Sequence, residues 1–235
     1  MSETVSMHII ATIHSDFKEK FGIPRQSGLV EELEASIVFE PEYRNEHALR
    51  GIEDYSHLWL LWQFSKNSDK AWTPTVRPPR LGGNERMGVF ATRSPFRPNG
   101  LGLSCVRLLR VEKDSQRGPV IYVAGADLLD GTPILDIKPY VPVADCHPEA
   151  AGGFSVQNNN YRLQVCFPKE LLKMIPDKKQ NALLGVLAED PRPAYQEDAD
   201  RIYGMNFAGY EIKFRVKENV LYVLDVLHSF SHSSR

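Results

Sequence analysis

The sequence is poor in cysteine, and the cysteines it has form no recognisable pair. Cys105, Cys146 and Cys166 are odd in number and lie far apart along the 235 residues. This spacing argues against a disulfide framework and excludes the C-x-x-C pairs of zinc and redox sites. We therefore expect reduced thiols and a cytoplasmic protein.

Long hydrophobic runs are absent as well. No apolar stretch approaches the roughly 18 residues that a membrane-spanning helix requires, and residues 1–17 lack the basic and apolar regions of a secretion signal. Apolar residues make up 42% of the chain and charged residues 25%, which is ordinary for a folded domain. The sequence predicts a globular protein with no membrane partner.

Common catalytic signatures are missing too. The sequence has no G-x-S-x-G elbow, no P-loop and no H-E-x-x-H motif. Its seven histidines are scattered, and neither His57 nor the 145–147 stretch has the spacing of a metal or nucleophile site. We expect no metal ion. We interpret Trp59, Trp62 and Trp72 as side chains of the core or its rim.

The net charge of −2 hides a strong polarity along the chain. Between positions 77 and 110 there are seven arginines, no lysine and one acid, Glu85, so this window carries +6 and the rest of the chain −8. The arginines are Arg77, Arg80, Arg86, Arg93, Arg97, Arg107 and Arg110. Arginine binds phosphate and carboxylate in a bidentate manner, so we predict that this window binds a polyanion. The alternative is a solvated surface whose arginines pair with acids elsewhere.

Residues 1–148 predict a mainly β domain. Short apolar runs broken by Gly, Pro, Asn and Asp predict strands at 8–13, 36–39, 57–64, 87–91, 103–111, 119–125 and 133–138. The run HLWLLWQF at 57–64 is typical of a strand that is buried on both faces or lines a closed barrel. No long amphipathic helix intervenes, which argues against a doubly wound α/β sheet and favours a barrel or sandwich.

A smaller α+β unit follows a polar linker at 149–160. We assign residues 161–235 to this C-terminal unit, with a strand at 161–167 and a helix over 169–188 that is interrupted at Pro176. Residues 210–216 and 220–227 alternate around a polar turn, which predicts a hairpin.

Two stiff, cationic loops flank the short run MGVFA. They read LGGNERMG at 81–88 and TRSPFRPNGLGLS at 92–104. Pro95 and Pro98 fix the second loop and lower the entropy lost on binding a ligand, which indicates a site. On the other interpretation, Gly100 and Gly102 only bend the chain before the next strand. A G-x-G pair without its third glycine and helix is no dinucleotide fingerprint.

The segment DLLDGTPILDIKPY at 127–140 brings three acids close in sequence. Asp127, Asp130 and Asp136 are placed to reach one cavity, where carboxylates hold a cationic group, orient a ribose hydroxyl or accept a proton. The alternative for Asp130 is a hairpin-turn residue, since Asp-Gly is a common turn.

Five segments together resemble one known family, the TsaA-like or TrmO (YaeB) tRNA methyltransferases. They are PRQ at 24–26, PPRLGGN at 78–84, MGVFATRSPFRPN at 87–99, DLLDGTPILDIKPY at 127–140 and DPRPAY at 190–195. The resemblance covers nearly the whole chain. One departure is Gly100-Leu101, where the family usually has Pro-Ile; without this proline we expect a more flexible loop.

The resemblance implies a single-sheet β-barrel that binds S-adenosylmethionine (SAM), lacks a Rossmann domain and works as a homodimer. It implies N6-methylation of N6-threonylcarbamoyladenosine (t6A to m6t6A) at position 37, in the anticodon loop of threonine tRNA. The implied cofactor contacts are Pro24, Arg25, Gln26, Ser65, Lys66, Arg93, Leu103, Asp127, Leu128, Leu129 and Asp130.

The chemistry of this reaction assigns further candidates. The adenine N6 lone pair is delocalised, so the site must align N6 with the methyl carbon and accept its proton; an in-line displacement needs no metal. We assign proton acceptance to Asp130 and Asp136, and positioning of the base to Lys138 and Tyr140. The predicted contacts to the anionic substrate are Arg77, Arg80, Arg86, Arg97, Asn99, Asp190, Arg192 and Tyr195.

Two other functions stay open at this point. A non-catalytic RNA-binding or nucleotide-sensing module on the same fold would bind the ligand without turnover. An unrelated barrel enzyme acting on a small phosphorylated metabolite would not bind tRNA. Transfer of a labelled methyl group to tRNA separates the methyltransferase from both.

Overall fold

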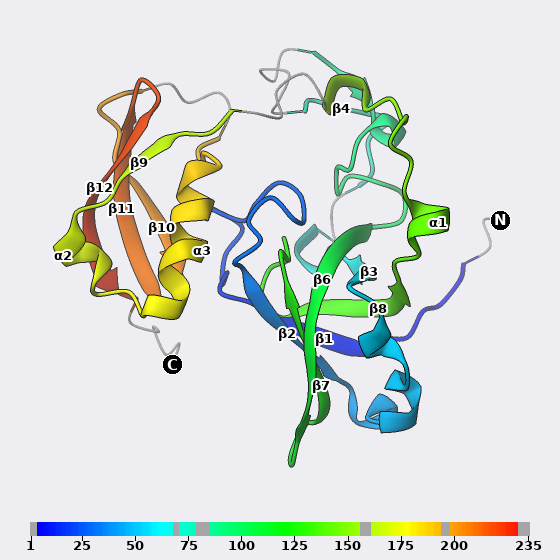
Figure 1. Ribbon diagram of the computed structural model, residues 1–235. Coiled ribbons are helices and arrows are strands. Elements are labelled where there is room, and N and C mark those ends of the chain that lie inside the picture. Colours follow the sequence, from blue (N-terminus) through cyan, green and yellow to red (C-terminus); the bar gives the residue numbers. More distant parts are fainter. Residues whose placement is uncertain (1–3, 68–70, 79–84, 156–160, 194–197, 230–235) are drawn as a thin grey trace.

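The structure is a computed structural model that describes residues 4–67, 71–78, 85–155, 161–193 and 198–229 (Figure 1). It contains a six-stranded sheet, a separate four-stranded sheet with helices, and a short two-stranded ribbon of β4 (Thr75–Val76) and β5 (Met87–Gly88). The prediction of a mainly β protein is confirmed. None of the helices in these ranges is long and apolar enough to cross a membrane.

Six antiparallel strands form the first sheet. They are β1 (Ala11–His14), β2 (Glu34–Phe39), β3 (His57–Gln63), β6 (Leu101–Asp114), β7 (Gly118–Ala124) and β8 (Thr132–Pro139). They pair in the order β1-β2-β7-β6-β3-β8, and β8 pairs in turn with β1. All strand edges of this sheet are therefore paired with a neighbour.

The core of this sheet follows from alternation along the strands. In β3 the side chains of Leu58, Leu60 and Trp62 are buried, whereas the residues between them are only half-buried. Ile37 of β2 and Ile134 of β8 are fully buried in the same cluster. The apolar run at 57–64 therefore has one face in the interior and one face partly covered.

The expected strand at 87–91 is wrong beyond Gly88. Residues Val89–Ala91 form a 3-10 turn instead. The Thr92 amide donates to the Val89 carbonyl at 3.1 Å, and the Thr92 hydroxyl donates to the same carbonyl at 2.8 Å. A threonine side chain that bonds the backbone in this way competes with strand pairing.

The C-terminal unit has a four-stranded sheet in the order β10-β11-β12-β9. Its elements are β9 (Gln164–Cys166), α2 (Lys169–Leu172), α3 (Asp177–Ala188), β10 (Tyr203–Phe207), β11 (Tyr210–Lys217) and β12 (Val220–His228). The helix break at Pro176 and the hairpin are confirmed. Strand β10, whose sequence YGMNF is short and contains a glycine, was not predicted, and neither was the one-turn helix α1 (Pro142–Asp145).

Residues 15–33, which we call the connecting segment, join β1 to β2 and lie between the two sheets (Figure 1). Phe17, Val30 and Leu33 of this segment are buried in the core of the C-terminal unit. Helix α3 packs against the same segment, since Gly185 lies directly beside Val30. The two units are thus joined by apolar packing that crosses the predicted boundary at 149–160.

Candidate functional site

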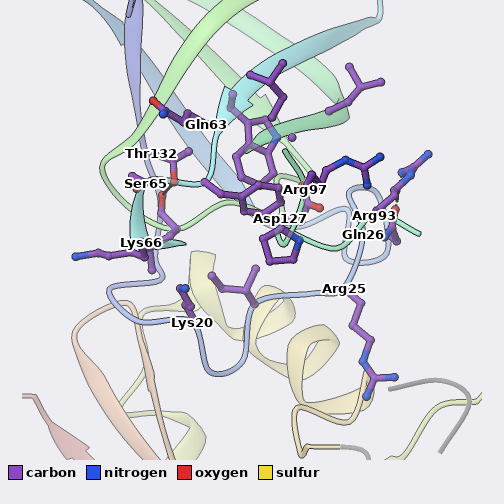
Figure 2. A pocket seen from close by; sticks show the side chains of 18 of the residues that line it. Lys20, Arg25, Gln26, Gln63, Ser65, Lys66, Arg93, Arg97, Asp127 and Thr132 are labelled. Carbon is purple, nitrogen blue, oxygen red and sulfur yellow. Dashed lines mark hydrogen bonds between the residues drawn. The ribbon is translucent and has the colours of Figure 1, made fainter. Parts of the chain in front are cut away.

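A cavity of about 470 Å³ opens between the connecting segment and the six-stranded sheet (Figure 2). The connecting segment contributes residues 20 and 23–26, and the end of β3 with the following turn contributes residues 62–66. Other walls come from residues 92–97, from the start of β6 at 101–103, and from Asp127, Leu129 and Thr132. This volume is in the range of small-molecule sites.

The floor of the cavity contains a chain of hydrogen bonds. The Trp62 indole Nε1 donates to the Ser104 hydroxyl at 3.0 Å, and this hydroxyl donates to Asp127 Oδ1 at 2.6 Å. Burial raises the pKa of Asp127, while the hydrogen bond from Ser104 and the charge of Arg93 oppose the shift. Asp127 is the one acidic side chain among the described residues that line the cavity.

We predict that the Asp127→Asn variant melts at a higher temperature than the wild type at neutral pH. Because the pKa of Asp127 is raised by burial, the folded chain holds this proton more tightly than the unfolded chain does. The stability of the wild type therefore falls as pH rises through the raised pKa. Asparagine cannot ionise, so thermal melts between about pH 4 and pH 8 should show no such fall in the variant.

Asp130→Asn is the matched control for this experiment, because the pKa of Asp130 is shifted in the opposite direction. Its carboxylate stabilises the fold above the ordinary aspartate pKa, and this contribution disappears as pH falls through the lowered pKa. The Asp130→Asn variant should therefore melt below the wild type at neutral pH, and the difference should close in acid. If the melting temperatures of the wild type and Asp127→Asn change with pH in parallel, the Asp127 carboxylate does not destabilise the fold and this prediction is wrong.

Gly102 allows Trp62 to lie flat against β6. The two residues are register partners across the β3–β6 pairing. A Cβ at position 102 would lie 2.3 Å from Trp62 Cε2 and 2.4 Å from its Cζ2. The rings of Trp62 and Phe64 are 4.4 Å apart in an edge-on arrangement, so an aromatic wall forms at this point. Gly102 therefore makes room for the wall and is more than a bend before a strand.

Cationic side chains surround the mouth of the cavity. Figure 2 shows Lys20 and Lys66 on one side of it and Arg93 and Arg97 on the other. Arg93 Nη1 donates to Gln26 Oε1 at 2.5 Å, which links the loop at 92–97 to the connecting segment. Arg97 Nη1 donates to the Thr92 carbonyl at 2.7 Å and so holds its own loop. The site therefore combines an apolar interior with a positive rim.

Most of the predicted cofactor contacts lie together at this cavity. They are Pro24, Arg25, Gln26, Ser65, Lys66, Arg93, Leu103, Asp127 and Leu129. Leu128 does not line it, because its side chain is 1% exposed and belongs to the core of the six-stranded sheet. Asp130 does not line it either.

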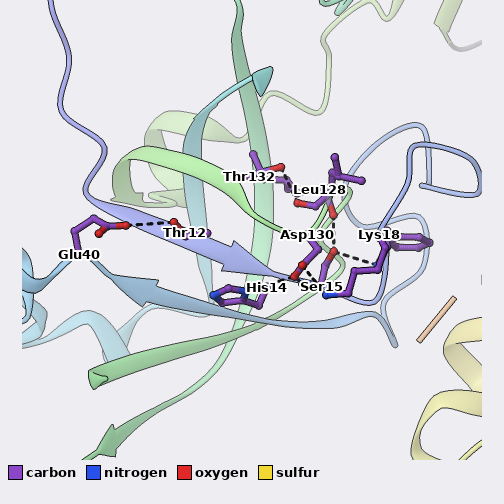
Figure 3. A network of polar contacts seen from close by, with 10 residues as sticks. Thr12, His14, Ser15, Lys18, Glu40, Leu128, Asp130 and Thr132 are labelled. Carbon is purple, nitrogen blue, oxygen red and sulfur yellow. Dashed lines mark hydrogen bonds and ion pairs between the residues drawn. The ribbon is translucent and has the colours of Figure 1, made fainter. Parts of the chain in front are cut away.

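Asp130 closes a turn instead of facing the cavity (Figure 3). Its Oδ2 lies 2.6 Å from Lys18 Nζ, and its Oδ1 accepts from the Ser15 amide at 3.1 Å and lies 3.4 Å from His14 Nδ1. Burial alone would raise the pKa of Asp130, but the Lys18 and Ser15 hydrogen bonds and the charges of Lys18 and His14 outweigh it and leave the pKa lowered. Its position and lowered pKa argue against the predicted role as proton acceptor and favour the turn interpretation.

The other three predicted catalytic residues are also away from the cavity. Asp136 pairs with Lys138 at 2.9 Å on the distal half of β8, where their register partners are Leu61 and Trp59. Tyr140 follows β8, and its ring lies 5.8 Å from that of Trp59. Strand β8 contributes to the cavity only through Thr132, at its opposite end. Within one chain these three side chains therefore do not meet at the cavity, contrary to our expectation.

The arginine window does not converge on the cavity as a whole. Of its members, Arg93 and Arg97 line the cavity. Arg77 is exposed, Arg86 Nε donates to Thr75 Oγ1 at 2.9 Å, and Arg110 pairs with a neighbouring acid, Glu112, on the distal part of β6. Arg80 lies outside the described residues. The positive rim is assembled instead from three separate stretches of sequence.

The remaining predicted substrate contacts are dispersed. Asn99 is exposed in the turn before β6. Asp190 and Arg192 pair with each other at 2.8 Å in the C-terminal unit, and both are nearly buried, at 12% and 13% exposed. Tyr195 lies outside the part of the chain that the structure describes. Asn99, Asp190 and Arg192 do not line the cavity.

Several cavity residues were not predicted from the sequence as cofactor or substrate contacts. They are Lys20, Ile23, Trp62, Gln63, Phe64, Thr92, Pro95, Leu101, Gly102 and Thr132. For Trp62 and Gly102 the sequence held a signal, because a glycine that faces an aromatic residue across two strands indicates close packing. Among the described residues no group of three histidine, cysteine or acidic side chains is placed to hold a metal ion.

Comparison with protein families identifies the chain. Residues 12–146 match the model of the tRNA-methyltransferase O N-terminal domain, and residues 160–229 match that of the TrmO C-terminal domain. The chain belongs to the TrmO family. The predicted family membership is thus confirmed, and the two TrmO models correspond to the six-stranded and four-stranded sheets.

Three known proteins resemble most of the chain. The tRNA (adenine(37)-N6)-methyltransferase of Escherichia coli is 42% identical over 219 residues, which are 89% of this chain and 92% of that protein. A putative S-adenosylmethionine-dependent methyltransferase, RcsF, of Pseudomonas aeruginosa is 38% identical over 232 residues, 95% of this chain and 98% of that one. The crystal structure of TrmO from Pseudomonas aeruginosa matches with a TM-score of 0.77 at 33% identity, covering 96% of this chain and 100% of that chain.

Proposed function

We propose that this chain is a SAM-dependent tRNA methyltransferase that methylates N6 of the adenine at position 37. Its substrate is t6A in the anticodon loop of threonine tRNA, which it converts to m6t6A. The observation that carries the proposal is the cavity, which joins an aromatic wall, one half-buried carboxylate and a cationic rim in a chain of the TrmO family. The relatives named as adenine-37 methyltransferases support the same activity.

The lining of the cavity suits SAM. The aromatic and aliphatic wall of Trp62, Phe64 and Leu103 is suitable for the adenine ring, because flat apolar rings bind in such slots. Asp127 is suitable for the cationic groups of the donor, and the guanidinium of Arg93 for its carboxylate. The closed ring of strand pairings supports the single-sheet barrel that holds these walls. When bound, SAM supplies an electrophilic methyl group.

The residues of the chain hold the donor and orient the base. When SAM is bound, Asp127 would hold its cationic groups and Arg93 its carboxylate, and the stiff loop at 92–97 would align the incoming base. Water at the open mouth takes the departing N6 proton, since a nitrogen that has just been alkylated is strongly acidic. Water thus takes the role of proton acceptor that the sequence suggested for Asp130 and Asp136. Neither of these side chains lines the cavity.

The rim is the proposed contact for the anticodon loop. Lys20, Arg25 and Lys66 add positive charge to that of Arg93 and Arg97, and bases of a single-stranded loop are splayed at little cost. Binding of tRNA should therefore weaken steeply with salt. We also propose that the protein acts as a homodimer. Exposed apolar side chains beside the cavity support a protein contact there: Leu101 is 40% exposed and Phe90 73%.

The test is methyl transfer with labelled SAM to threonine tRNA that carries t6A, compared with the same tRNA lacking the threonylcarbamoyl group. We expect label only in the first, at position 37. Binding of SAM and tRNA without transfer would support the non-catalytic module instead. Absence of SAM binding in calorimetry at millimolar ligand would overturn the proposal.

A further inference from the structure

The connecting segment has two faces, and each belongs to a different part of the molecule. One face, with Lys20 and residues 23–26, lines the cavity. The other is embedded in the C-terminal unit, where Phe17, Val30 and Leu33 are between 1% and 3% exposed. The connecting segment is therefore a thin layer between the cavity and the core of the C-terminal unit.

The packing behind the wall leaves little room for movement. The Phe21 ring stacks at 6.5 Å from both Tyr203 and Phe214. A Cβ at Gly22 would lie 2.3 Å from Met205 Sδ of β10. Because Gly22 precedes the cavity-lining Ile23 directly, contacts in the C-terminal unit fix the backbone where it enters the site.

Helix α3 also packs closely against the connecting segment through a glycine. A Cβ at Gly185 would lie 2.6 Å from Val30 Cγ1. Gly185 lies within α3, three residues before its end, where glycine weakens a helix and is kept for a packing reason. Helix α3 therefore approaches the side chain of Val30 more closely than an alanine at position 185 would allow.

Two polar contacts also join the connecting segment to the C-terminal unit. Lys179 Nζ of α3 lies 2.5 Å from Asp16 Oδ2, and both side chains are largely buried, at 22% and 14% exposed. Asn206 Nδ2 of β10 donates to Glu19 Oε1 at 2.7 Å. Apolar packing alone tolerates sliding, whereas such pairs specify one position of the segment.

We propose that the C-terminal unit is the scaffold of the donor site and holds the connecting segment in its binding conformation before SAM arrives. Gly185 and Met205, which do not line the cavity, are then positioning residues for SAM affinity. The inference rests on the proposed function. A wall that is already ordered costs no entropy when the ligand binds, so loosening it weakens binding without changing the chemistry.

The Gly185→Ala variant of the full chain tests this. Alanine is the better helix former, so α3 itself is not weakened, but its methyl group pushes Val30 and the connecting segment. We expect the calorimetric Kd for SAM and the KM for SAM to rise together, about tenfold, with kcat within about twofold of the wild type. Without cofactor, amides of residues 15–33 should exchange hydrogen faster.

Two further variants separate positioning from general loss of stability. Val30→Ala removes the methyl group that the new side chain would meet, so the double variant Gly185→Ala/Val30→Ala should bind SAM within about threefold of the wild type. Val216→Ala removes packing within the β11–β12 pairing, where Val216 is the partner of Leu221. It should lower the melting temperature and leave SAM affinity unchanged.

The outcomes distinguish this inference from the proposed function. If the wild type does not bind SAM, the proposed function fails, and the exchange rates of residues 15–33 still decide whether α3 positions the segment. If the wild type binds SAM and Gly185→Ala binds it equally well, the scaffold inference is overturned. It is also overturned if Val216→Ala weakens binding as much as Gly185→Ala.

Discussion

The Gly102→Ala substitution is expected to weaken SAM binding about tenfold to a hundredfold, about 1.4–2.8 kcal/mol of binding free energy, because overpacking displaces a ring that lines the site. The new methyl group would overlap the six-membered ring of Trp62 and push it into the cavity. Displacing Trp62 would also break its hydrogen bond to Ser104, which in turn donates to Asp127. Calorimetry with SAM measures the loss, and the shifted indole should change the fluorescence of the free protein.

Gly100→Ala is the matched control, because Gly100 lies two residues away, just before β6. Its Cβ would meet nothing closer than Phe64 Cβ at 4.0 Å, which is ordinary contact. We expect wild-type SAM affinity and wild-type fluorescence. If both alanine variants bind SAM as the wild type does, Trp62 is not part of the donor site.

The Arg93→Ala substitution is expected to reduce SAM affinity about tenfold or more, as the loss of a charge-assisted hydrogen bond does. Arg93 donates to Gln26 and its charge opposes the rise in the pKa of Asp127. Without it, the carboxylate at the floor loses its cationic neighbour and the link between two walls is broken. Calorimetry gives the affinity, and methyl transfer at saturating tRNA gives KM for SAM.

Arg86→Ala is the control for this prediction. Arg86 belongs to the same charged window, but it is exposed and bonds Thr75 outside the cavity. Its removal should leave SAM affinity unchanged and reduce tRNA binding modestly, through the loss of one positive charge. Survival of both SAM affinity and methyl transfer in Arg93→Ala would show that the cavity has been assigned to the wrong ligand.

The sequence predicted elements well where its pattern was local. Alternation and turn residues identified β3, β6, β7, β8 and the β11–β12 hairpin, and Pro176 identified the helix break. Strand β10 was missed because five residues with a glycine give too weak a pattern. The expected strand at 87–91 was wrong because the Thr92 side chain bonds the backbone there.

The cofactor contacts were expected from the family resemblance and not from local pattern. Of these, the short motif from Pro24 to Gln26 reaches the cavity as a unit. Charge counted along the chain was misleading, because successive residues of a strand point to opposite faces and Arg110 on β6 pairs with its own neighbour, Glu112. The role of Asp130 depended on Lys18, more than a hundred residues away, and only the folded chain brings the two together.

The core shared between the two units has a consequence for synthesis of the protein on the ribosome. Phe17 leaves the exit tunnel long before Phe207, against whose ring it packs at 5.6 Å. Until β10 to β12 have been translated, the apolar side chains of residues 15–33 have nothing to cover them, and the nascent chain is prone to aggregation and to capture by chaperones. The first wall of the cavity to be translated is thus among the last to acquire its native shape.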